Sequence, residues 1–455
     1  MEGRPTRLPP RDATPADIDL SDIQGNVLRG YTMPAAAYLM LRISDVAQAT
    51  ALLRRSLPLV STAETWDRQP AAAINLSFSF AGLQQLGLDP DTLASFPPAF
   101  REGMRARATL LGDVGPSAPD QWEFDEPHVL VSVYAADAAH LEKTLGSVLV
   151  PDAQDGVELL HVQRAHELPG GKDHFGFFDG VSQPAIQGSG VLSRPGDGIR
   201  HGERGWREIA TGEVLLGYPD EDGTLPKAPH APYDRNGTYV VLRKLAVDTA
   251  AFRRFVAEAD HPGGPELLAA KIVGRWPDGT PLALAPDGPD EALAGDPSRI
   301  NDFGYADDPQ GLRCPLGSHI RRANPRDAPS FFGGRLSARH RIVRRGRAYG
   351  DPLPPGVMDD DGADRGLVFV SFQSNVWRQF ETIQAQWIND GDRFGLGRDT
   401  DPLVGEPHPG STKLTVPGTP PYFVTARPRL VTMRGGAYLF QPSMTALRHL
   451  AGLGA

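Results

Sequence analysis

Apolar residues in the first half of the chain recur in short runs that predict strands, and two of these runs are followed by helical spacing. Residues 38–44 (YLMLRIS) have the composition of a strand buried on both faces, and Asp45 can cap the helix that follows. The alternating valines of 128–134 predict a strand, and Asp137 can cap the next helix. Further strands are predicted at 71–80 and 157–163.

The second half repeats this plan. Residues 238–245 and 367–372 are predicted strands, and each precedes a segment with a helical apolar stripe; Asp248 can cap the first of these helices. The segment RLVTMRGGAYLFQP (429–442) predicts a β-hairpin that turns at its Gly-Gly pair, Gly435 and Gly436. The matching alternation suggests a duplicated architecture.

The order of elements predicts an α+β fold of ferredoxin-like type, with one sheet and helices on one face. A Rossmann fold has less support because no GxGxxG follows a strand. A loop-like stretch rich in proline and glycine separates the two halves. The predicted units are an extended arm (1–20), an N-terminal domain (21–190), a linking region (191–237) and a C-terminal domain (238–455). A Pro/Gly/Asp-rich insertion (276–312) is too long for a connector, so it is expected to be functional or mobile.

Composition narrows the function classes. The chain has 455 residues, of which 40% are hydrophobic and 22% charged, as in ordinary globular proteins. Its net charge of -10 argues against a nucleic-acid or anionic membrane surface as the partner. Cys314 is the one cysteine, which excludes internal disulfides, CxxC zinc sites and the CxxCH motif of c-type haem. Without a secretory signal or a long apolar segment, the protein is expected to be cytoplasmic, with export left open.

The sequence lacks a GxxxxGK[ST] phosphate loop, an HExxH helix and a GxSxG elbow. Among the remaining candidates, Asp179 lies in GFFDG (176–180). An Asp-Gly pair is common in turns, so a structural role is one interpretation. In the other, the carboxylate faces an apolar cavity, where desolvation would raise its pKa from about 3.9 and allow it to shuttle protons.

A basic segment, RCPLGSHIRRANPRD (313–327), contains the second candidate, His319. A single histidine can be a packed core residue or a metal ligand. The nearby arginines can form a solvated face or clamp carboxylate groups; they are Arg321, Arg322 and Arg326. Arg344, in RIVRRGRAYG (341–350), follows the apolar start of a predicted strand and could equally be an exposed or ion-paired arginine.

Taken together, these segments resemble the dye-decolorizing peroxidases, a family of b-type haem enzymes. The resemblance extends over nearly the whole chain, and the order and spacing of its motifs agree with the family. The motifs are DIQGNVLRGY (22–31), GFFDGVSQP (176–184), SHIRRANPRD (318–327), RIVRRGRAYG (341–350), GLVFVSFQSNVWRQFETIQ (366–384) and MRGGAYLFQPS (433–443). It implies two ferredoxin-like domains with antiparallel sheets, of the dimeric α+β barrel type, with haem b between them.

The resemblance also implies residue roles. His319 matches the proximal histidine that binds the haem iron, Asp179 the distal aspartate and Arg344 the distal arginine. Leu367 and Phe369 match apolar residues over the distal haem face, and period-two alternation puts both on one side of their strand. From its place beside His319, Arg322 is expected to bind the cofactor.

The implied reaction is the reduction of hydrogen peroxide at ferric haem, with dyes, phenols or other small aromatic reductants as electron donors. Asp179 would accept a proton from peroxide and return it, and Arg344 would stabilise the developing negative charge. An aspartate base predicts activity at acidic pH. Trp377 and Tyr349 are candidate electron relays, although either could simply be a packed aromatic residue.

Proximal histidines of haem peroxidases usually donate their second ring hydrogen to a carboxylate. The position expected to supply that acid holds Asn375, which cannot do so; Glu381 or Asp401 could. Two other functions are weighed against the peroxidase: a haem-binding or haem-trafficking protein with slow peroxide turnover, and a ferredoxin-like binding module without haem. No nucleic acid or membrane partner is expected, and assembly into a homo-oligomer is left open.

Overall fold

The computed structural model describes residues 18–148, 156–202, 205–407, 413–425 and 428–453. The first half contributes four antiparallel strands to the main sheet, in the order β4-β1-β3-β2. Helix α2 (Val46–Ser56) connects β1 to β2 together with η1, and α7 (Ala138–Val148) connects β3 to β4. This βαββαβ order is that of a ferredoxin-like unit, as predicted. The strands are β1 (Ala35–Ile43), β2 (Ala72–Phe78), β3 (Val129–Ala135) and β4 (Val157–His166).

The second half has the same topology, with the order β13-β7-β10-β9 and antiparallel pairing throughout. Helices follow its first and third strands, α8 (Thr249–Glu258) after β7 and η7 (Trp377–Ile388) after β10. The predicted duplication of the architecture is therefore confirmed. The strands are β7 (Thr238–Val247), β9 (Arg347–Tyr349), β10 (Gly366–Gln373) and β13 (Val431–Gln441).

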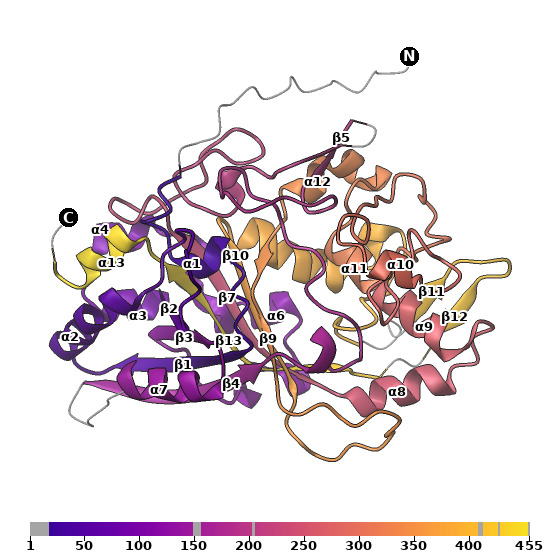
Figure 1. The fold of residues 1–455 in the computed structure, drawn as a ribbon, viewed down its shortest axis with the longest axis horizontal. Helices are drawn as coiled ribbons and strands as arrows, with labels where there is room; N and C mark the ends of the chain where they lie inside the picture. The colour runs from indigo at the N-terminus through magenta and orange to yellow at the C-terminus, as the bar shows by residue number, and fades with distance from the viewer. Residues whose placement is uncertain (1–17, 149–155, 203–204, 408–412, 426–427, 454–455) are drawn as a thin grey trace.

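The two four-stranded units join into one closed ring of strands. His166 of β4 pairs with Ala348 of β9, and Phe440 of β13 pairs with Phe78 of β2. Figure 1 shows the strands of the first half toward the left and those of the second half toward the middle. The 191–237 segment, predicted as a linking region, carries a small β5-β6 sheet and also adds buried residues such as Leu215 to the core inside the ring.

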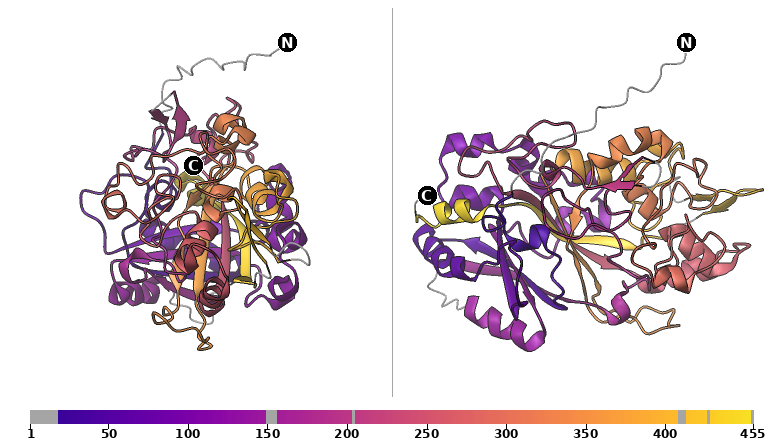
Figure 2. Two further views of the ribbon diagram at one scale, coloured as in Figure 1. Left: turned by 90° about the vertical axis from the view of Figure 1, so that its right-hand side faces the viewer. Right: turned by 45° about the horizontal axis from the view of Figure 1, so that its top comes forward.

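Alternating side chains of the strands form two cores. Tyr38 of β1, Leu242 of β7 and Val370 of β10 belong to one buried cluster, which fills the ring. Residues of the opposite strand faces, such as Leu39, pack against helices that include α2. Figure 2 shows helices around the outside of the strands from two further sides.

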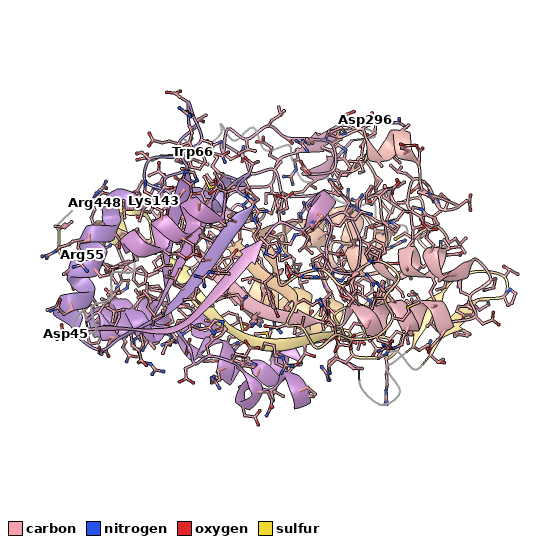
Figure 3. All side chains as sticks on the ribbon, turned by 60° about the horizontal axis from the view of Figure 1, so that its bottom comes forward. Asp45, Arg55, Trp66, Lys143, Asp296 and Arg448 are labelled. Atoms are coloured by element: carbon pink, nitrogen blue, oxygen red, sulfur yellow. The ribbon has the colours of Figure 1, made fainter. Side chains whose placement is uncertain are left out.

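Aspartate caps begin several of these helices, as predicted. Asp45 accepts a hydrogen bond from the Gln48 amide at the start of α2, and Asp248 accepts one from the Ala251 amide at the start of α8. Asp45 and Arg55, at the two ends of α2, lie on the outer surface (Figure 3).

The segment predicted as a hairpin at Gly435 and Gly436 is instead one continuous strand, β13, with a register shift between Met433 and Gly435. The glycine serves packing rather than a turn: a Cβ at Gly435 would lie 2.5 Å from the ring of Phe124. The hairpin prediction was wrong because a local Gly-Gly signal does not reveal this distant ring.

The helix predicted after β10 is present, and it is a π-helix, η7. The Glu381 amide bonds to the Val376 carbonyl and the Asn389 amide to the Gln384 carbonyl, each five residues back. None of the described helices is long and apolar enough to cross a membrane.

Shorter elements complete the chain. The remaining strands are β5 (Ile199–His201), β6 (Gly205–Arg207), β8 (Val343–Arg344), β11 (Leu414–Val416) and β12 (Tyr422–Val424). The other α-helices are α1 (Gly25–Leu28), α3 (Phe80–Gln85), α4 (Pro90–Ser95), α5 (Pro98–Ala106), α6 (Ala108–Leu111), α9 (Gly264–Val273), α10 (Glu291–Ala294), α11 (His319–Ala323), α12 (Arg335–Ala338) and α13 (Met444–Leu450). Short 3-10 turns are η1 (Leu57–Leu59), η2 (Gly115–Ser117), η3 (Pro119–Gln121), η4 (Pro169–Gly171), η5 (Thr211–Glu213), η6 (Pro329–Gly334) and η8 (Asp392–Phe394).

Candidate active site

A cavity of about 1110 Å³ lies against the outer face of β10 and receives residues from both halves of the chain. Leu367 and Phe369 are half-buried and line it, whereas Val368 and Val370 are buried inside the ring of strands. The predicted alternation is thus correct for this strand. The cavity volume lies just above the usual range of ligand pockets, roughly 300–1,000 Å³, so a ligand as large as a tetrapyrrole has room.

His319, at the first position of α11, lines the cavity with its side chain 25% exposed. Its Nδ1 lies 3.0 Å from Oδ2 of Asp401, which is fully buried. Oδ1 of Asp401 accepts the amide hydrogens of Leu403 and Val404, both at 2.9 Å. Because the carboxylate accepts a hydrogen bond from Nδ1–H, the Nε2 atom keeps its lone pair and can act as a metal ligand.

Burial by itself would raise the pKa of Asp401, but its interaction with His319, which includes their hydrogen bond, and the charge of Arg322 hold that pKa below its usual value. Asp401 is therefore an ionised partner for the imidazole. Of the alternatives considered from sequence, Glu381 instead pairs with Arg107, and Asn375 Oδ1 accepts the Arg378 amide hydrogen at the start of η7.

Asp179 lies on a loop that lines the cavity, and its side chain is exposed. Its amide donates to the Gly171 carbonyl at 2.9 Å, and its Oδ1 accepts the Gly180 amide hydrogen at 2.6 Å. That the surroundings of Asp179 are apolar and desolvated stays a prediction. Nearby, burial raises the pKa of Asp173 to about 6; the Phe177 amide hydrogen bond opposes this rise and the charge of Asp179 adds to it.

Arg344 connects the Asp179 loop to the sheet. It ends β8, which pairs with β10 at Ser371. The Arg344 Nη2 donates to the Ser182 carbonyl at 2.7 Å, and the Arg344 amide donates to Gln183 Oε1 at 3.0 Å. Arg344 is exposed and lines the same cavity as Asp179 and His319. The structure thus brings the three principal candidates together.

Three buried arginines, Arg275, Arg326 and Arg341, form a basic part of the cavity wall. Their guanidinium groups donate to backbone carbonyls and to Asn301, and none forms an ion pair with a carboxylate among the described residues. Burial lowers the pKa of Arg275 and of Arg341 to about 9. Such charges are costly to bury without a counter-charge, so this wall suits an anionic ligand.

The prediction that Arg322 binds the cofactor was wrong. Its side chain is fully buried and does not line the cavity. The guanidinium group lies over the Phe394 ring and donates to four backbone carbonyls instead, those of Gly317, Trp387, Asp390 and Asp399. Within the arginine-rich segment, Arg326 reaches the cavity, whereas Arg321 is buried against Asp308.

Two carboxylate–guanidinium pairs in the cavity wall were not anticipated. Asp113 pairs with Arg243, and Glu406 pairs with Arg429. Asp113 and Arg243 lie far apart in sequence, so no local motif predicts that they form a pair. Arg243 and Lys244 together interrupt the apolar run of their strand, and that interruption was the available signal.

These features fit a haem group. The wide cavity, the imidazole with a free nitrogen and the apolar side chains of β10 suit the macrocycle, and the unpaired basic wall suits its two carboxylates. Residues 276–312, expected to be functional or mobile, contribute Phe303 and Tyr305 to this wall, which agrees with the functional alternative.

The chain is similar to known proteins in both sequence and structure. Residues 22–150 match the model of the DyP dimeric alpha+beta barrel domain. The chain is 31% identical to Peroxidase 2 of Mycetinis scorodonius, covering 96% of this chain and 88% of the relative. It is 30% identical to the multifunctional dye peroxidase DyP2 of Amycolatopsis sp. (strain ATCC 39116 / 75iv2), covering 95% and 96%.

Solved structures agree. An ancestral D-type dye decolorizing peroxidase superposes with a TM-score of 0.83 and 29% identity, over 97% of this chain and 100% of the other. A dye-decolorizing peroxidase in complex with 2,6-dimethoxyphenol has a TM-score of 0.79 and 27% identity, over 95% and 100%. A deferrochelatase of Yersinia pestis bv. Antiqua (strain Nepal516) is 38% identical over only 18% of this chain and 16% of the relative.

Proposed function

Because the chain belongs to the dye-decolorizing peroxidase family and is a haem-dependent peroxidase that uses hydrogen peroxide, we propose that it holds haem b in the cavity beside β10. It oxidises small aromatic reductants either inside this cavity or by electron transfer through the protein. The observation that supports this most directly is that His319, Asp179 and Arg344 line one cavity of suitable size.

In this proposal, Nε2 of His319 binds the iron while Nδ1 donates to Asp401. The ionised Asp401 makes the imidazole a more basic ligand and fixes the orientation of its ring. Leu367 and Phe369 present an apolar surface to the macrocycle. Bound haem supplies the redox chemistry by which the two oxygen atoms of peroxide are separated.

Asp179 acts as the base in this proposal: its carboxylate accepts a proton from one peroxide oxygen and returns it to the departing oxygen. Arg344 stabilises the negative charge that develops on that oxygen. The hydrogen bond from Arg344 to the Ser182 carbonyl supports this arrangement because it ties the loop of the base to the strand beside the cavity. Aspartic acids ordinarily titrate near pH 3.9, whereas a histidine base would be protonated below about pH 6.5. We therefore expect activity to persist at acidic pH.

Aromatic reductants are proposed by analogy with the relative solved with 2,6-dimethoxyphenol. Trp377 is 64% exposed at the start of η7, and Phe380 on the same helix lines the cavity, which supports Trp377 as a surface relay. Tyr349 is buried beside the cavity residue Ala348, but Lys244 lies 4.8 Å from the centroid of its ring. A cation over the ring opposes the loss of an electron, so Tyr349 is the weaker candidate.

The test uses Asp179→Asn and Arg344→Leu in haem-loaded protein. Each change should lower kcat/KM for peroxide by about 10²–10³-fold while the Soret band stays in place. Glu167→Gln is the matched control, since Glu167 is an exposed acid in the same cavity wall and should retain activity. Full activity of Asp179→Asn would refute the assignment of the base.

The haem-trafficking alternative draws on the short similarity to a deferrochelatase. It predicts firm haem binding with slow peroxide turnover in the unmodified protein. Turnover at rates ordinary for enzymes, about 1–10³ s⁻¹, would exclude it.

A further inference from the structure

Tyr438 on β13 is a buried tyrosine with a carboxylate partner. Its side chain is fully buried, and its hydroxyl donates to Glu381 Oε1 at 2.9 Å. Glu381 lies on η7 and is 1% exposed. The pair therefore joins the central sheet to the helix that lines the cavity.

Tyr349 also donates to a carboxylate, Asp364 Oδ1 at 3.2 Å, but that side chain is 58% exposed, whereas Glu381 is buried. The hydroxyls of Tyr239 and Tyr305 have no hydrogen-bond partner in the described part of the chain. A phenol with a carboxylate acceptor can pass on its proton when it loses an electron, whereas an isolated buried phenol has no base to take that proton. Tyr438 thus has a chemical property that Tyr239, in the same core, does not share.

One aromatic ring separates Tyr438 from the cavity. Phe380 lines the cavity and packs edge-on against Tyr438, with ring centroids 6.3 Å apart. Phe380 also lies 6.0 Å from Phe369, which belongs to the cavity wall on β10. These contacts form a continuous aromatic path from Tyr438 to the position proposed for haem.

Proton transfer from Tyr438 must accompany electron loss. Burial, reinforced by the negative charge of Glu381, raises the pKa of Tyr438 well above its usual value, so the phenol stays protonated until it is oxidised. Arg107 donates to both oxygens of Glu381, at 2.5 and 2.6 Å, and also to Glu102 at 2.5 Å. If Glu381 becomes neutral, Glu102 still balances the charge of Arg107.

We propose that Tyr438 is an internal electron donor whose oxidation is coupled to proton transfer to Glu381. The inference rests on the proposed peroxidase function, because peroxide bound at the cofactor is the oxidant. Reduction of one peroxide to two waters takes two electrons and two protons. Tyr438 supplies one of these electrons through Phe380, its O–H bond breaks, and the proton moves to Oε1 of Glu381. The second electron comes from the bound cofactor, and the two protons that enter water come from solvent. The products at the pair are a neutral tyrosyl radical and a protonated glutamic acid; an external reductant returns the electron and Glu381 returns the proton.

The test mixes haem-loaded protein with one equivalent of peroxide, without reductant, and records both the absorption spectrum and the freeze-quenched electron paramagnetic resonance spectrum. A tyrosyl signal that narrows on ring deuteration of tyrosine is expected. Tyr438→Phe should lose this signal, and the matched control Tyr239→Phe should keep it. An unchanged signal in Tyr438→Phe, or no tyrosyl signal in the unmodified protein, would overturn the inference.

Two measurements guard against an effect of misfolding. In the unmodified protein, the tyrosyl signal should form more slowly in deuterium oxide, because the phenolic proton moves with the electron; equal rates would contradict the coupling. Glu381→Gln keeps the hydroxyl acceptor but not the base, so it should suppress the signal in protein with an intact Soret band. If the Soret band does not respond to peroxide, the proposed function itself is wrong. If it responds normally but no radical forms at Tyr438, only this inference is wrong.

Discussion

Replacement of Asp401 by asparagine tests the proximal pair with nearly no change in volume. Oδ1 of Asp401 accepts two amide hydrogens, from Leu403 and Val404, so the amide oxygen of asparagine should keep that position. Its NH2 group would then face Nδ1 of His319, where two donors cannot form a hydrogen bond. The imidazole would have to move its hydrogen to Nε2, the nitrogen proposed to bind iron.

The loss in binding free energy comes from the bond between His319 and Asp401. Asp401→Asn removes one charge-assisted hydrogen bond of 3.0 Å at a fully buried site, and such bonds contribute about 1.5–3 kcal/mol. Loss of such a partner typically weakens metal binding or activity about 10–100-fold. We expect haem affinity to fall by the same factor, about 1.4–2.7 kcal/mol. The iron potential should rise, because a less basic ligand stabilises ferric iron less.

The assay is a haem titration of the apoprotein followed at the Soret band, together with spectroelectrochemistry of the loaded protein. Asp399→Asn is the control. Asp399 is also buried, but its carboxylate contacts Thr415 and Lys413 rather than His319. If Asp401→Asn and Asp399→Asn both match the unmodified protein in affinity and potential, the role assigned to Asp401 is wrong.

Other predictions concern stability. Arg322→Met should lower the free energy of unfolding by about 3 kcal/mol, because buried backbone carbonyls lose their hydrogen-bond donor. The haem affinity of the folded protein should stay unchanged. A selective loss of haem would instead indicate that Arg322 does bind the cofactor. Burial lowers the pKa of His340 to about 4, so the folded state favours its neutral form. The stability that this gives is present above pH 6.5 and is lost as pH falls toward 4, by about 3 kcal/mol in all. Urea titrations across this range should show a smaller decline in His340→Gln than in the unmodified protein. Gly435→Ala should cost about 1–3 kcal/mol because its Cβ meets the Phe124 ring, and an unchanged midpoint in thermal unfolding would contradict that packing.

Local chemistry explains what the sequence could predict. The strand at 38–44 and the helix after Asp45 follow from alternation and capping, which act within a few residues. His319 and Asp179 lie in motifs whose resemblance to a family extends over the chain, and both line the cavity. The roles of these two residues remain predictions, but their presence in one cavity wall is a structural fact.

Contacts between distant segments explain what the sequence could not predict. Gly435 signals a turn until the ring of Phe124 is placed beside it. Arg322 is adjacent to residues that reach the cavity, yet three of its four carbonyl partners come from much later in the chain. The choice of Asp401 over Glu381 likewise depends on tertiary packing, since neither acid is near His319 in sequence.

The pairing of β4 with β9 and of β13 with β2 joins the edge strands of one four-stranded sheet to those of the other. Cut between its halves, the protein would expose the unpaired backbone groups of β4 and β2 in one fragment and of β9 and β13 in the other. Bare strand edges of this kind invite aggregation. Either fragment produced alone is therefore expected to aggregate, whereas the two produced together can cover each other's strand edges.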